Sequence, residues 1–182
     1  MKKLVFILPI VLIFASCKCK KEASSSTNTT TTMIDSSKKI LKSDCPTDGK
    51  CTTEIFRNKA LDVKTDDIGA IYYNKIDNPN TSVIVYKYNR TVPEGVQDGN
   101  YSEEIVFEIN NSDKSLVLND AALQQTKMLF GRFCFCRGAA GNFKIEKGNL
   151  NLSQKNGEVS FQLEFKTTKV PQVIGVISEI IK

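Results

Sequence analysis

Apolar and polar residues alternate along several short segments of this 182-residue chain. The clearest segment is 158–165, where the odd-numbered residues are apolar and the even-numbered ones are polar. Segments 82–88 and 103–109 show the same period of two. This period predicts β-strands, and one apolar face opposite one polar face is typical of an antiparallel sheet. Weaker patterns predict further strands at 52–57, 60–64, 68–74, 115–118, 128–137, 143–146, 149–153 and 172–181.

Turn-forming residues separate the predicted strands, at 77–80, 98–100, 110–113, 138–142, 147–149 and 155–157. Asn156-Gly157 between two alternating segments is the strongest hairpin signal in the chain. Only 119–125 has a helical pattern, and Asn119 or Asp120 is its expected cap. Many short strands with tight connections predict an all-β, mainly antiparallel fold. We expect a β-sandwich or a small barrel with one short helix.

The segment 128–137 (MLFGRFCFCR) differs from the others because it is apolar on both faces. A strand with two apolar faces belongs in the middle of a fold, between two sheets or between a sheet and its covering helix. We therefore expect this segment to lie at the centre of the domain. Arg132 and Arg137 flank its second half, either to ligate an anion or to cap the strand ends.

The chain begins with the pattern of a secretory signal. Lysines at 2–3 precede an apolar run over 4–14, and small residues follow at 15–16. The apolar run is too short to cross a bilayer as a helix, which needs about 20 residues. Residues 1–16 are therefore predicted to be a signal peptide.

Residues 14–17 (Phe-Ala-Ser-Cys) resemble the lipobox of bacterial lipoproteins, with Phe14 in the position where leucine is usual. The resemblance implies cleavage before Cys17, attachment of diacylglycerol to its sulfur and acylation of its new amino group. Two or more acyl chains anchor a protein stably, so the lipid bilayer is the first expected partner. Lys18 directly after Cys17 favours the outer membrane, and the leaflet is left open.

Composition divides the mature chain into two parts. Residues 17–44 are rich in Ser, Thr and Lys, lack aromatic residues and carry a net charge of +3, which predicts a flexible tether. Residues 45–182 hold 17 basic and 17 acidic residues and have the length of one globular domain. A neutral domain lacks the basic surface that nucleic-acid binding requires, so no nucleic-acid partner is expected.

Six cysteines are present, and Cys17 is assigned to the lipid. Cys19 falls in the tether, as an exposed thiol or as a partner for another molecule. The domain contains four more, and export favours disulfide bonds among them. In an extended strand, residues two apart have Cα atoms about 6.5 Å apart, so Cys134 and Cys136 are not expected to bond to each other if that segment is extended.

Three arrangements of the domain cysteines stay open. Two bridges would join Cys45 and Cys51 to Cys134 and Cys136. Alternatively, a single Cys45–Cys51 bridge would leave two buried thiols. In the third arrangement all four thiolates bind copper(I) or zinc, with Cys134 and Cys136 as one arm of the site.

Several catalytic chemistries are excluded by composition. The chain has no histidine, which removes Ser-His-Asp and Cys-His catalysis, and it has no tryptophan. Phosphate-binding loops, the GxGxxG motif and EF-hand loops are also missing. The acidic pairs 66–67 and 103–104 are interpreted as solvated charges. We therefore expect no catalytic residue and no bound cofactor.

The lipobox, the tether and the β-rich body together resemble an envelope lipoprotein of a Bacteroidota-type bacterium. That resemblance implies export and anchoring only. Our leading hypothesis is a non-enzymatic binding or structural domain at the cell envelope, with an envelope protein or a small ligand as its partner. One alternative is copper or zinc handling through Cys134 and Cys136. The other is carriage of an apolar ligand in a barrel, which predicts an apolar cavity of several hundred Å³.

Overall fold

The computed structural model describes residues 45–182, and the predicted signal peptide, Cys17 and tether lie outside the described residues. The all-β fold is confirmed. No helix of residues 45–182 has the length and apolar content to cross a membrane. The elements, in chain order, are β1 (Gly49–Thr65), β2 (Ile71–Arg90), β3 (Tyr101–Asn110), β4 (Ser115–Asn119), the 3₁₀ helix η1 (Asp120–Thr126), β5 (Leu129–Cys134), β6 (Gly141–Lys144), β7 (Gly148–Lys155), β8 (Glu158–Phe165) and β9 (Val176–Ile181).

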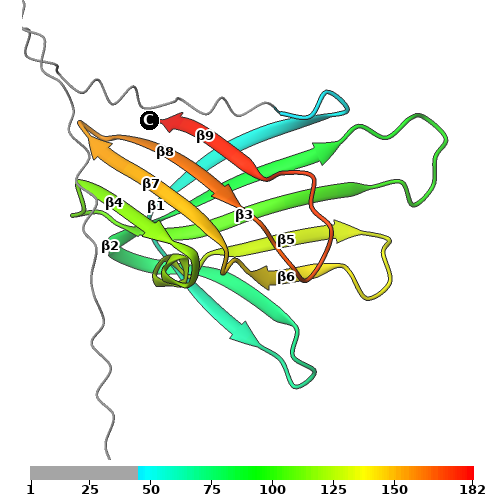
Figure 1. The fold of residues 1–182 in the computed structure, drawn as a ribbon, viewed down its shortest axis with the longest axis horizontal. Helices are drawn as coiled ribbons and strands as arrows, with labels where there is room; N and C mark the ends of the chain where they lie inside the picture. The colour runs from blue at the N-terminus through cyan, green and yellow to red at the C-terminus, as the bar shows by residue number, and fades with distance from the viewer. Residues whose placement is uncertain (1–44) are drawn as a thin grey trace, which may run out of the picture. The chain divides into compact units, whose positions relative to one another are not determined.

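Two antiparallel sheets make up this domain (Figure 1). The first has the order β1-β2-β3-β5-β6, and a further pairing of Ile71 with Asn142 joins β6 back to β2. This pairing closes β2, β3, β5 and β6 into a small barrel. The second sheet has the order β4-β7-β8-β9 and packs on one face of the first. The domain therefore combines the two architectures that the sequence predicted as alternatives.

The main core lies between the two sheets. The apolar face of β8 is buried there as the alternation predicted, and Phe161 packs edge-on against Phe107 of β3 with ring centroids 5.3 Å apart. The turn between β7 and β8 is also confirmed. Asn156 and Gly157 have φ angles of 53° and 79°, the pair of positive values that a type I′ turn requires. The buried face of β8 and the residues of the turn thus both match the predicted hairpin.

A second core fills the small barrel. The long hairpin of β1 and β2 is irregular in the middle, where Asn58, at φ 57°, lies opposite the four residues 78–81. The tight turn predicted at 77–80 is therefore wrong, because β2 continues through Pro79 and an irregular bulge accommodates this residue without a backbone N–H. Beyond the bulge the hairpin contributes to the second core, whose buried members are Leu61, Val83, Val85, Val106 and Leu129.

Strand β5 occupies the central position that its two apolar faces predicted. Phe130 is buried in the core between the sheets, whereas Leu129 is buried in the barrel core. The strand is shorter than predicted, however, and ends at Cys134. Phe133, one residue before this end, is 40% exposed, and Phe135, directly after it, is 85% exposed. The end of β5 therefore presents two exposed aromatic rings.

Candidate functional site

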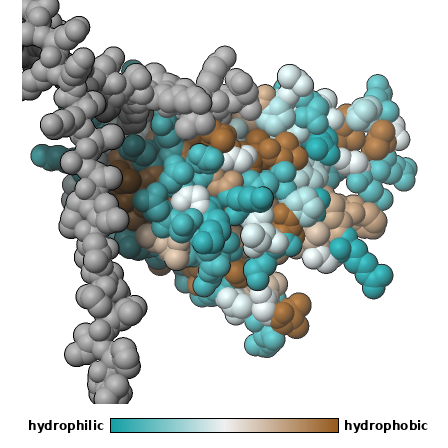
Figure 2. All heavy atoms as spheres, in the orientation of Figure 1, coloured by the Kyte–Doolittle hydropathy of each residue, from teal (hydrophilic) through white to brown (hydrophobic). Residues whose placement is uncertain are grey.

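The loops at one end of the first sheet surround a surface hollow of about 530 Å³, called here the loop-end hollow. Strands β2, β3 and β5 reach this end, where the 91–100 and 135–140 loops emerge (Figure 1). Hydrophobic residues appear among hydrophilic ones at this end of the space-filling view (Figure 2). The lining combines aromatic, charged and small polar side chains, from Asn89, Arg90, Asp98, Asn100, Tyr101, Ser102, Phe133, Cys134 and Phe135.

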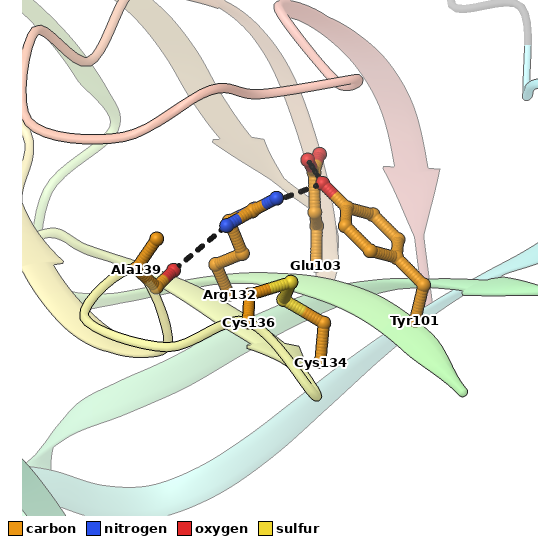
Figure 3. Close-up of a disulfide and its surroundings, with 6 residues drawn as sticks. All are labelled: Tyr101, Glu103, Arg132, Cys134, Cys136 and Ala139. Carbon is orange, nitrogen blue, oxygen red and sulfur yellow. Dashed lines mark hydrogen bonds between the residues drawn. A yellow bond between two sulfur atoms is a disulfide. The ribbon is translucent and has the colours of Figure 1, made fainter. Parts of the chain in front are cut away.

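A disulfide joins Cys134 to Cys136 at the edge of the hollow (Figure 3). The expectation that these two cysteines do not pair is wrong, because the chain leaves the extended conformation directly after Cys134. The Cys136 N–H donates to the Cys134 carbonyl at 2.8 Å, which closes a three-residue turn. The Cα atoms are therefore 5.2 Å apart, within the usual range for a disulfide.

The second disulfide joins Cys45 to Cys51, with Cα atoms 5.8 Å apart. This bridge was predicted in one alternative, although that alternative left Cys134 and Cys136 as thiols, and the predicted bridges from Cys45 and Cys51 to Cys134 and Cys136 are wrong. All four cysteines of the described domain are oxidised, and no cluster of three metal-binding side chains occurs among residues 45–182. Copper or zinc binding would first require reduction of these bridges, so that hypothesis stays a prediction.

Arg132 ties the disulfide loop to the sheet. Its Nη1 donates to the Ala139 carbonyl at 2.9 Å, and its Nε donates to the Tyr101 hydroxyl at 3.3 Å (Figure 3). The Ala139 N–H in turn donates to the Cys136 carbonyl at 3.1 Å. The loop is thus held by hydrogen bonds in addition to the disulfide. Of the two roles predicted for Arg132, the observed bonds match the structural one.

Two guanidinium groups lie against the ring of Tyr101. The central carbon of Arg90 is 4.4 Å from the ring centroid, and that of Arg132 is 5.3 Å away. Both distances are suited to cation–π attraction. Burial raises the pKa of Tyr101, and the hydrogen bond that its hydroxyl donates to Glu103 at 2.5 Å raises it further. Tyr101 is therefore a neutral, fixed part of the wall of the hollow at physiological pH.

Glu103 lies behind this wall and is completely buried. Its carboxylate accepts the Tyr101 hydroxyl and the backbone N–H groups of Val173 and Ile174, at 2.6 and 2.7 Å. The prediction that residues 103–104 are solvated charges is wrong, since Glu104 is also buried and accepts the Tyr73 hydroxyl at 2.6 Å. Apart from Tyr101, these donors come from segments 31 to 71 residues away in the chain, beyond the reach of local sequence patterns.

The loop-end hollow therefore combines three aromatic residues, Arg90, Asp98 and one cysteine of the disulfide in its lining. The sequence signal for it was the repeated Phe-Cys pair at 133–136, which was interpreted as a buried strand. Comparison of the chain with protein-family models, with curated proteins and with solved structures gives no match.

Proposed function

We propose that this protein is an envelope lipoprotein, anchored through lipidated Cys17, whose domain binds another envelope protein at the loop-end hollow. One observation carries the binding role. Phe135, 85% exposed, and Phe133, 40% exposed, line the same hollow as Tyr101, whose ring lies against two guanidinium groups. The binding role requires no catalytic residue, and the sequence contains no histidine.

The chemistry of the hollow supports a protein partner. Aromatic residues and arginine are the side chains most enriched at the energetic centres of protein interfaces. The hollow also has amide and hydroxyl side chains, from Asn89, Asn100 and Ser102, that can pair with a polypeptide backbone. Phe135 lies in a loop held by the disulfide and by the Arg132–Ala139 hydrogen bond. The loop therefore loses little conformational entropy when a partner binds over Phe135.

The apolar-carrier alternative has less support. A carrier needs an empty apolar cavity, whereas the inside of the small barrel is filled by the second core around Val85, Val106 and Leu129. The copper or zinc alternative needs free thiolates, and the four described cysteines are paired. Protein binding at an exposed surface requires neither condition.

Photocrosslinking in the bacterium that produces the protein tests the proposal. Benzoylphenylalanine is placed at Phe135 in one strain and at Val117 in a matched strain. Val117 is 64% exposed on β4 of the other sheet. We expect a discrete protein adduct from position 135 that position 117 does not form. An adduct pattern shared by both positions, or a small-molecule adduct alone at position 135, would contradict a protein partner at the hollow.

A further inference from the structure

We propose that the Cys134–Cys136 disulfide is a thiol–disulfide exchange site that oxidises a pair of cysteine thiols in a polypeptide. This activity goes beyond the proposed binding function and does not depend on the lipid anchor. Four features of the structure support it. They are the location of the bridge outside the core, its short chain separation, the independent support of its loop and the open hollow beside it.

The two disulfides differ in their surroundings. Cys45 and Cys51 are partly buried and pack against the main core between the sheets. Neither Cys134 nor Cys136 belongs to either hydrophobic cluster, and Cys134 lines the loop-end hollow. Access of an attacking thiolate to a disulfide sulfur is one determinant of the exchange rate. On this ground the Cys134–Cys136 bridge is the reactive one.

The short separation makes the bridge a weak structural cross-link. Only Phe135 lies between the two cysteines, so the bond restricts the unfolded chain less than a bridge across a longer loop would. A bond that contributes little to stability can be opened without unfolding the domain. Its presence at a surface turn is therefore better explained by a role other than stabilising the fold.

The loop also has support that does not depend on the bridge. Cys134 still pairs with Tyr101 in the sheet, and Arg132 still holds the Ala139 carbonyl when the sulfurs separate. Both redox forms can thus keep the same fold, as a site that cycles between disulfide and dithiol requires. Arg132 lies two residues before Cys134 on the same face of β5, and a positive charge beside a cysteine favours its thiolate form.

The reaction is a two-electron exchange between sulfurs. A substrate thiolate attacks Sγ of Cys134, the bond to Cys136 breaks, and Cys136 leaves as a thiolate while a mixed disulfide forms. The second substrate thiolate then attacks the substrate sulfur of the mixed disulfide and releases the Cys134 thiolate. The products are a substrate disulfide and the reduced Cys134–Cys136 pair, which holds the two electrons. A second disulfide, small or protein-bound, restores the bridge by the reverse exchange.

Glutathione titration of the full protein tests this proposal with an internal control. The protein is equilibrated at a series of ratios of reduced to oxidised glutathione, free thiols are alkylated, and peptide mass spectrometry reports each bridge separately. We expect the Cys134–Cys136 bridge to open at a ratio at least ten-fold less reducing than the Cys45–Cys51 bridge, with the circular dichroism spectrum unchanged. Equal ratios for the two bridges, or opening only together with unfolding, would overturn the proposal.

A stoichiometric reaction tests the direction of electron flow. A reduced peptide with two cysteines is mixed with excess oxidised protein under nitrogen. We expect one peptide disulfide to form for each Cys134–Cys136 bridge lost. The Cys134→Ser/Cys136→Ser double variant should form none, whereas Cys45→Ser/Cys51→Ser should retain the reaction. If the latter variant does not fold, loss of the Cys134–Cys136 bridge in the unmodified protein supplies the same assignment. Peptide oxidation that persists in the first double variant would refute the site.

Discussion

Replacement of Glu103 should show how strongly a buried carboxylate holds the site together. The Glu103→Ala change removes the acceptor of three hydrogen bonds, which come from the Tyr101 hydroxyl and two backbone N–H groups. Hydrogen bonds to a charged group each contribute about 1.5–3 kcal/mol, for a gross loss of about 5 kcal/mol or more. Relief of the burial cost of the charge offsets part of this loss. We therefore expect the free energy of unfolding to fall by about 3 kcal/mol.

Urea unfolding followed by circular dichroism, at pH 7 with both disulfides intact, measures this loss. Glu103→Gln keeps one acceptor oxygen but turns an amide NH₂ toward a donor, so a loss of about 2 kcal/mol is expected. Glu164→Gln is the matched control, because Glu164 is exposed on β8 and its change should stay within about 0.5 kcal/mol. A Glu103→Ala variant within about 1 kcal/mol of the unmodified protein, a third of the expected loss, would refute the reasoning.

Three further predictions use the same unfolding measurement. Gly148→Ala should destabilise the protein by about 3 kcal/mol, because the added Cβ would lie 2.1 Å from the Glu164 carbonyl oxygen. Gly157→Ala should cost only about 1 kcal/mol, because its Cβ meets open space and only the positive φ of 79° opposes it. Equal losses for the two variants would contradict the predicted clash at Gly148. Phe107→Ala removes a buried ring and should lower the free energy of unfolding by about 3–5 kcal/mol, whereas Phe135→Ala removes an exposed ring and should lower it by under about 0.5 kcal/mol. A larger loss from Phe135→Ala than from Phe107→Ala would contradict the exposure of Phe135. Burial raises the pKa of Glu179, so the folded protein retains a proton above the ordinary glutamate pKa of about 4.3. The free energy of unfolding should therefore fall as pH rises through this window, and Glu179→Gln should abolish that fall.

Local patterns predicted the parts of the fold in which local and tertiary preferences agree. The alternation over 158–165 gave the buried face of β8, and Asn156-Gly157 gave its hairpin. The double apolar face of 128–137 gave the central position of β5. In each case the residues that form the sequence pattern are also the residues that form the buried contacts or the turn.

The site was less predictable because it depends on residues far apart in the chain. Glu103 looked like a surface charge, since its backbone donors at 173–174 follow it by 70 residues or more. The Asp-Asn-Pro-Asn segment at 77–80 has turn chemistry, but a strand bulge accommodates the same residues. The Cys134–Cys136 bond was excluded only on the assumption of an extended backbone, and the strand ends at the first of the two cysteines. The strand ends three residues before its predicted end, and the boundaries of an element are the part that a sequence pattern predicts least well.

The envelope assignment depends most directly on the chemical state of the chain in the cell. Intact-mass spectrometry of the protein from its producing bacterium, with and without reduction, measures that state in one experiment. We predict a chain that begins at lipidated Cys17, is recovered with the membranes and gains two hydrogens for each of the Cys45–Cys51 and Cys134–Cys136 bridges on reduction. A chain that begins at Met1 without lipid, is recovered from the cytosol and does not change mass on reduction would contradict both the anchoring and the oxidised site.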